Sequence, residues 1–281
     1  MKSNDLPNGL LSNFDFTLCK YEELCKAIVK SSYTAITLAD YLERGHQADG
    51  KYLIMRHDVD RMPGRALGTA QVEQRHGIKA TYYFRDRKST FVPEILDAIA
   101  LSGHEIGYHY ETIDKCKGHF EDAIMLFEQE LKAFKGRYKV STVCAHGNPL
   151  TGYDNKDIWK TARLSDFGLL GEAFLSLDFN QFAYFSDSGR TWQKNESQKM
   201  PGKDSVTTAF EQVRPVRTDD VIKIVKEGAL PNICILTHPE RWSADVPGFL
   251  GRYLLDTAFS WGKVAIFTFR KVMNNEINLH N

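Results

Sequence analysis

Four short polar clusters contain the residue types that bind metal ions and transfer protons. Each cluster ends an apolar run, and the four occupy positions 56–60 (RHDVD), 104–109 (HEIGYH), 145–149 (AHGNP) and 236–239 (LTHP). Barrel and open-sheet enzymes place their catalytic groups at the ends of several different strands. The dispersed clusters therefore predict a hydrolytic metal site to which each strand contributes one ligand or catalytic group.

The first cluster ends in two carboxylates, Asp58 and Asp60, which are separated by Val59. If the preceding strand continues through them, both carboxylates face the same side and Val59 faces the core. Two close carboxylates can divide the work, because one can hold a metal while the other accepts a proton from water. The alternative is that both cap a helix expected at 63–76 through its N-terminal amides. The residue pattern leaves both interpretations open.

Histidines end three of the expected strands. His109 follows a strand expected at 105–108 and is a natural metal ligand, whereas His238 follows a strand expected at 233–236 and could protonate a leaving amine. His146 and Asn148 end a strand expected at 141–145, where Gly147 suggests a tight turn close to a ligand; an ordinary polar turn is the alternative. Five other histidines are expected to be ordinary hydrogen-bonded groups, namely His46, His76, His104, His119 and His280.

The elements that position these clusters alternate between strands and helices. Apolar runs predict strands at 52–55, 79–84, 105–108, 141–145, 233–236 and 264–269. Helical spacing and end signals predict helices at 63–76, 93–101, 120–134, 154–162 and 248–261. Shorter apolar pieces lie at 169–175 and 182–185, and the polar stretch 186–216 is expected to be a long functional loop. This alternation indicates an α/β fold with parallel strands, either a barrel or a doubly wound sheet.

The chain is expected to divide into a short N-terminal part and one larger domain. Residues 1–50 form a helical N-terminal extension in this interpretation, with helices at 16–31 and 36–44 that cap the barrel. Residues 51–281 form a single (β/α) barrel domain.

Composition limits the partners and the compartment. The 36 basic and 36 acidic side chains cancel without a long run of one sign, so no electrostatic footprint for nucleic acid or an anionic membrane is present. Five cysteines without a Cys-x-x-Cys pair argue against a disulfide framework and a cysteine zinc cluster. The N-terminus lacks the apolar core of a signal peptide, and no stretch approaches the length of a membrane span. We therefore expect a soluble, cytoplasmic protein whose partner is small or neutral; the oligomeric state stays open.

The order of the clusters, over roughly residues 52–269, resembles the polysaccharide deacetylase family, the carbohydrate esterases with a NodB-like homology domain. The resemblance implies an irregular (β/α) barrel with motifs at the strand ends. Asp58 and Asp60 match a spaced version of the family's aspartate pair, which implies a general base and a metal ligand. Residues 103–109 (GHEIGYH) match the motif with a histidine ligand, here His109, and 236–238 (LTH) match the strand that ends in the general acid, here His238.

The chain departs from the family pattern at two places. Ile113 stands four residues after His109, where the family has a second histidine ligand, and an isoleucine cannot bind a metal. The family's Arg-x-Pro-Tyr motif is replaced by 146–149 (HGNP), which has no arginine to orient the base.

A catalytic zinc or another divalent metal normally takes three protein ligands plus water, so Asp60 and His109 require a third ligand. We expect His146 to supply it, with Asp187 or Glu111 as alternatives. Four residues are expected to contact substrate, namely Asn148, Asp187, Arg190 and Trp192. Among them Trp192 could stack on a sugar ring and Arg190 could contact an anionic group. A solvated loop with a half-buried tryptophan is the alternative interpretation of 184–192.

These residues predict metal-dependent hydrolysis of an N-acetyl or other N-acyl sugar, with Asp58 taking a proton from water and His238 donating one to the departing amine. The absent signal peptide favours a cytoplasmic precursor of surface polysaccharide, such as a nucleotide- or lipid-linked sugar. One alternative is a catalytically inactive carbohydrate-binding protein on the same fold, favoured by Ile113 and the missing arginine. Another is metal-free hydrolysis of a cyclic amide, which would need Glu111 and His146 to turn inward.

Overall fold

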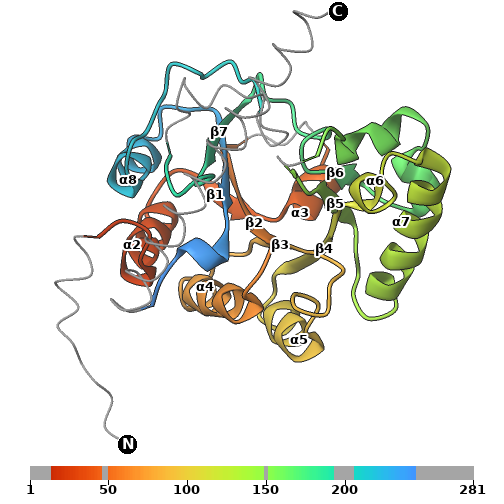
Figure 1. Ribbon diagram of the computed structural model, residues 1–281. Coiled ribbons are helices and arrows are strands. Elements are labelled where there is room, and N and C mark those ends of the chain that lie inside the picture. The colour runs from red at the N-terminus through yellow and green to blue at the C-terminus, as the bar shows by residue number, and fades with distance from the viewer. Residues whose placement is uncertain (1–13, 46–49, 149–150, 193–205, 245–281) are drawn as a thin grey trace, which may run out of the picture.

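A single parallel sheet forms the centre of the molecule (Figure 1). The computed structural model describes residues 14–45, 50–148, 151–192 and 206–244. Seven strands follow one another in the order β6-β5-β4-β3-β2-β8-β7, and an eighth, β1, pairs with β2. The strands are β1 (Thr34–Ile36), β2 (Tyr52–Val59), β3 (Thr81–Phe84), β4 (Glu105–Tyr110), β5 (Thr142–Ala145), β6 (Gly171–Glu172), β7 (Phe182–Ser186) and β8 (Asn232–Thr237). Every pairing among them is parallel, as the alternation of strands and helices predicts.

Strand β2 lies at the centre of the sheet and pairs along both edges. Residues 53–57 pair with β8 on one edge, whereas on the other edge residues 52–54 pair with β1 and residues 56–59 pair with β3. The strand is four residues longer than the predicted 52–55. Polar residues continue it because Arg56, His57 and Asp58 all find buried partners, which removes the cost of burying them.

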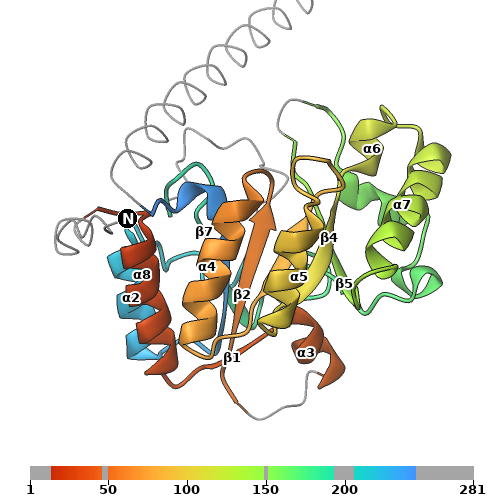
Figure 2. The same cartoon turned by 90° about the horizontal axis from the view of Figure 1, so that it is seen from below.

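Helices cover the outer face of the sheet (Figures 1 and 2). They are α2 (Leu18–Val29), α3 (Leu38–Glu43), α4 (Pro63–Arg75), α5 (Pro93–Leu101), α6 (Thr112–Lys115), α7 (Phe120–Lys135) and α8 (Thr218–Glu227), with 3₁₀ helices η1 (Asn155–Lys160), η2 (Leu164–Phe167) and η4 (Pro239–Arg241). Helix α2 packs beside α4 and α8 (Figure 2). Helix α3 differs, because its first amides bind Thr81 and Glu105 where β3 and β4 begin, so it lies at the starting edge of the sheet.

Two apolar clusters lie on the two faces of the sheet. The larger one contains Leu53, Met55 and Val59 of β2 together with the inward faces of the outer helices. The smaller one contains Ile54, with Leu38 of α3 and aromatic residues from neighbouring strands. Because successive strand residues point to opposite faces, residues 56 and 58 continue the inner face to which Ile54 belongs. The polar end of β2 therefore reaches the concave side of the sheet.

The sheet curls strongly into a half-barrel, which is barrel-like but open in the described part of the chain (Figure 1). The predicted α/β class and parallel pairing are confirmed, whereas the predicted barrel is seen here only as this half-barrel. The helix predicted at 248–261 and the strand predicted at 264–269 lie outside the described residues.

Several elements differ from the sequence-based expectation. The N-terminal extension contains strand β1 as well as its helices, because residues 34–36 pair with β2. The helix predicted at 154–162 is the short 3₁₀ helix η1, which begins at the side-chain cap of Asp154. Helix α8 was not predicted, although Val221 and Val225 have helical spacing and Gly228 ends the helix with a φ of 61°. Across the ranges that the structure covers, no helix combines the length and apolar character needed to span a membrane.

Candidate metal and acid–base site

Five residues expected at the site meet at the edge where the strands end. Asp58 is the penultimate residue of β2, Asp60 follows that strand, and His109 is the penultimate residue of β4. His146 and His238 directly follow β5 and β8. Because all these strands are parallel, their ends share one edge, and residues far apart in the sequence become neighbours there.

Asp60, His109 and His146 bring three potential ligand atoms together. Oδ1 of Asp60 lies 3.0 Å from Nδ1 of His146 and 3.4 Å from Nε2 of His109. The two ring nitrogens lie 3.3 Å apart, and all three atoms lie within 4.8 Å of one another. One carboxylate and two imidazoles are a common ligand set for catalytic zinc and for other first-row divalent ions.

The backbone of β5 orients the ring of His109. Nδ1 lies 3.0 Å from the carbonyl oxygen of Cys144, which can only accept a hydrogen bond, so Nδ1 carries a proton. In the neutral ring Nε2 then holds the lone pair, and this atom faces Asp60 and His146. Metal-binding histidines commonly donate their other N–H to a carbonyl in this way. The ring of His109 is thus already oriented as a ligand.

The carboxylate of Asp60 has the properties of an unsatisfied ligand. Its Oδ1 is buried but makes no hydrogen bond of acceptable geometry within the described residues, although two ring nitrogens lie at ion-pair distance. Burial raises the pKa of Asp60, but His146 and His109 outweigh this effect and hold the pKa well below its ordinary value. An ionised carboxylate oxygen that lies 3.0 and 3.4 Å from two imidazole nitrogens fits a bound cation.

Arg56 holds Asp58 from two positions earlier on the same strand. Its Nε and Nη2 donate to the two carboxylate oxygens at 2.9 and 2.7 Å, and both side chains are buried. Burial raises the pKa of Asp58, but Arg56 outweighs this effect and the pKa lies below its ordinary value. The segment 146–149 has no arginine, and the arginine that contacts Asp58 in the structure is Arg56. The sequence contained a signal for this contact, because residues 56 and 58 are two apart on one strand and therefore share one face.

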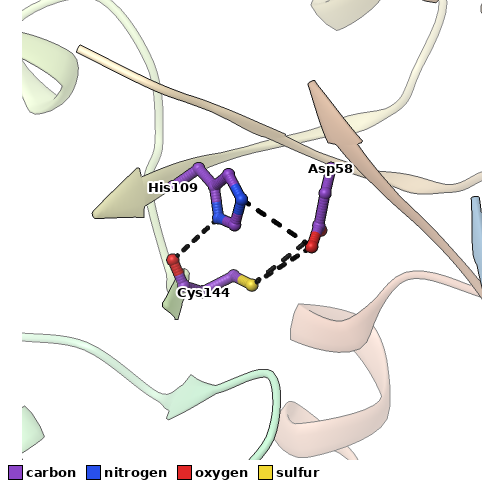
Figure 3. A group of neighbouring side chains, drawn as sticks. All are labelled: Asp58, His109 and Cys144. Atoms are coloured by element: carbon purple, nitrogen blue, oxygen red, sulfur yellow. Dashed lines mark hydrogen bonds and ion pairs between the residues drawn. The ribbon is translucent and has the colours of Figure 1, made fainter. Parts of the chain in front are cut away.

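Cys144 forms a second group with Asp58 and His109 (Figure 3). Its sulfur lies 3.7 and 3.8 Å from the carboxylate oxygens of Asp58, but it also lies 2.7 Å from Nη2 of Arg56. A cation bound here would lie beside the fixed guanidinium charge, and two unit charges 4 Å apart repel by about 4 kcal/mol at the effective dielectric constant of such sites. The group of Asp60, His109 and His146 is therefore the better cation site.

Asp187 fixes the ring of His238. The Nδ1 atom of His238 lies 2.6 Å from Oδ1 of Asp187, and the backbone N–H of His238 donates to the same carboxylate at 3.0 and 3.1 Å. Trp242 donates to the other oxygen at 3.0 Å. Burial and Arg241 lower the pKa of His238, but Asp187 outweighs them and raises the pKa above its ordinary value of 6.5. Because Nδ1 is bound to Asp187, Nε2 is the ring nitrogen that can exchange a proton with a molecule at the site.

The pairing of β2 with β8 places Asp58 beside His238. His57 and Thr237 are register partners, and each directly precedes one member of this pair. Neighbouring strands lie about 5 Å apart, so the carboxylate and the imidazole share one end of the site.

No protein-family model matches the chain, and a search of curated proteins finds no match. What the structure itself shows is an α/β fold with a parallel, strongly curled half-barrel sheet. The function is therefore inferred from the side chains that the sheet brings together.

Glu111 binds two arginines instead of joining the predicted ligands. Arg87 donates to its two oxygens at 2.7 and 2.9 Å, and Arg85 donates to them as well. Burial raises the pKa of Glu111, but the arginines outweigh this effect and lower the pKa to about 2. Ile113 is 1% exposed and belongs to the larger apolar cluster. The structure therefore offers His146, from the next strand, as the nitrogen that position 113 lacks.

The predicted substrate contacts are only partly at this site. Asp187 is fully buried and bound to His238, which favours a positioning role over a place among the ligands or substrate contacts. Trp192 is 5% exposed, packs against Phe16 and Trp242, and donates from Nε1 to Thr218 at 3.0 Å. This burial argues against its stacking on a sugar, because its ring is already covered.

Two other predicted substrate contacts lie in partly exposed segments. Arg190 lies over the ring of Phe16 at 5.9 Å, which directs its guanidinium toward the aromatic group around Trp192. Asn148 lies two residues beyond His146 and is partly exposed.

Proposed function

We propose that this protein is a metal-dependent hydrolase that removes an N-acetyl or other N-acyl group from a sugar. The observation that carries the proposal is the convergence of Asp60, His109 and His146 beside an acid–base pair, Asp58 and His238. This is the constellation that amide hydrolysis requires, with a cation site, a proton acceptor and a proton donor at one edge. The resemblance of the sequence clusters to polysaccharide deacetylases supports the same reaction.

The side chains divide the proton transfers between them. Asp60, His109 and His146 would hold a divalent cation, which would supply polarisation of an acyl carbonyl and a lowered pKa of bound water. Asp58 accepts the proton of the attacking water, since its lowered pKa keeps it ionised at neutral pH. His238 donates the proton at Nε2 to the departing amine, and the raised pKa of its ring favours the protonated form.

The substrate that we propose is a small cytoplasmic precursor, such as a nucleotide- or lipid-linked N-acyl sugar. The balanced charge of the chain supports a small substrate over nucleic acid. Asn148 lies next to the proposed ligands and is our candidate for contact with the sugar.

Metal-free hydrolysis by Glu111 and His146 has less support. Glu111 is held by Arg85 and Arg87, and His146 faces Asp60. A catalytically inactive binding protein is also less well supported, because Arg56 binds Asp58 as the missing motif arginine was expected to do.

Metal content of the purified protein tests the proposal. We expect about one zinc or similar ion per chain by elemental analysis, lost in His109→Ala and in His146→Ala. His119→Ala is the matched control, because His119 is an exposed histidine at the start of α7 and should leave the metal in place. A wild-type protein that stays metal-free after incubation with zinc, manganese or cobalt would exclude the metal-dependent reaction.

Acetate release tests the reaction itself. A nucleotide-linked N-acetylhexosamine and the free sugar serve as two probes, with Asp58→Asn and His238→Gln as variants. We expect each variant to retain the metal and to lose about 10²- to 10⁴-fold in kcat, the usual contribution of one proton-transfer group. Metal-loaded wild type that releases acetate from neither probe would contradict deacetylation of these sugars.

A further inference from the structure

His57 lies on the opposite face of β2 from Asp58 and belongs to a polar network that the proposed reaction does not use. It is fully buried, with Nδ1 at 2.6 Å from Oγ1 of Thr237 and Nε2 at 2.8 Å from Oε1 of Glu73. Both partners are also fully buried. The imidazole therefore joins β2 to β8 on one side and to α4 on the other.

The bond between His57 and Thr237 crosses the two strands that carry the acid–base pair. The two residues are register partners, and the next residue on each strand is Asp58 or His238. Alternation along a strand directs His57 and Thr237 to the outer face and Asp58 to the inner face. Any slip or rotation between the two strand ends would break this hydrogen bond and move the two proton-transfer groups relative to each other.

Glu73 anchors the network to the outer helices. Besides His57 it accepts hydrogen bonds from Tyr21 of α2 at 2.5 Å and from Tyr82 of β3 at 2.6 Å. Burial raises the pKa of Glu73, but His57 outweighs this effect and the carboxylate stays ionised. Leaving one member of such a network without its partner is costly, so the network resists displacement of the His57 ring.

We propose that His57 and Thr237 are positioning residues that set the distance between Asp58 and His238, with Glu73 holding the His57 ring in place. This inference rests on the proposed roles of Asp58 and His238 in proton transfer. None of its three residues belongs to the metal ligands or touches the reacting atoms, so their effect should fall on the chemical step.

A matched pair of substitutions at Thr237 tests the inference. Thr237→Val keeps the shape of the side chain but removes the hydroxyl, whereas Thr237→Ser keeps the hydroxyl. We expect Thr237→Val to lower kcat by about 10- to 100-fold, because small displacements of catalytic groups can cost about 10²-fold. KM and metal content should stay at the wild-type values, and Thr237→Ser should recover most of kcat. Wild-type kcat in Thr237→Val, or an equal loss in both variants, would overturn the inference.

Two further measurements separate this inference from the proposed function. If wild type binds metal but has no deacylase activity, the proposed function fails, and the positioning is judged by NMR of the imidazole nitrogens. Thr237→Val should then shift the ring signals of both His57 and His238, and Thr237→Ser should not; an unshifted His238 would overturn the inference. If Thr237→Val does not fold, Glu73→Gln takes its place. We expect Glu73→Gln to lower kcat while KM and metal content stay unchanged. A wild-type kcat in Glu73→Gln would overturn the inference.

Discussion

Arg56 and Asp58 form a buried ion pair between alternate residues of one strand, with hydrogen bonds of 2.9 and 2.7 Å. The guanidinium also lies over the ring of Phe174, 4.1 Å from its centroid, which gives it a second contact. The proposed base is thus held by a residue of its own strand. No residue from another strand is needed to hold Asp58, so β4 and the end of β5 can supply the proposed metal ligands His109 and His146.

Removing the arginine should destabilise the fold through the charge left behind. We expect Arg56→Gln to lower the free energy of unfolding by about 3–5 kcal/mol, the usual cost of leaving a buried charge unpaired. The double variant Arg56→Gln/Asp58→Asn should recover much of this loss, because the unpaired charge is gone. Urea unfolding of the two single variants and the double variant measures the coupling. Additive losses would show that the two side chains do not interact energetically.

The pH dependence of the reaction should depend on Asp187. In the proposed reaction His238 acts when protonated, so activity should fall as the pH rises through its pKa, which Asp187 raises above 6.5. Asp187→Asn should therefore move the alkaline limb of kcat/KM to lower pH and also lower kcat. Asp157→Asn, in the peripheral helix η1, is the control. An alkaline limb that stays in place in Asp187→Asn would contradict the role of His238 as the acid.

Glu111 should contribute stability that disappears in acid. Its pKa falls from 4.5 to about 2 on folding, which corresponds to about 3 kcal/mol. Because the pKa is lower in the folded state, this contribution is complete above about pH 4.5 and is lost as the pH falls toward 2. Glu111→Gln should therefore be less stable than wild type at pH 7, and the two proteins should converge only near pH 2. Denaturant unfolding at several pH values measures the difference, and a difference that does not depend on pH would contradict the ion pair.

Trp192 should affect stability and leave substrate binding unchanged. Trp192→Phe removes the hydrogen bond to Thr218 and part of the packing against Phe16, so we expect a loss of about 1–2 kcal/mol in unfolding free energy. KM for an active sugar substrate should equal the wild-type value. A raised KM with unchanged stability would instead support the original prediction that this ring stacks on a sugar.

Much of the site could be predicted because strand ends follow from local pattern. Asp58, His109 and His238 each close an apolar run, and the structure places all three at one edge of the sheet. The third potential ligand was harder to predict, since the sequence pattern allowed His146, Glu111 or Asp187 in that role. Arginine side chains hold Glu111 and His238 holds Asp187, so neither carboxylate is available as the third ligand. These partners come from distant parts of the chain.

The sequence by itself determined the alternation of strands and helices, the parallel sheet and the polar residues at its strand ends, because these depend on the period of neighbouring side chains. Only the tertiary structure decided that β1 joins the sheet, that Trp192 is buried and that Asp60, His109 and His146 meet. Each of these depends on contacts between residues distant in the sequence. Such contacts are set by packing and by competition for buried hydrogen bonds, which local spacing does not encode.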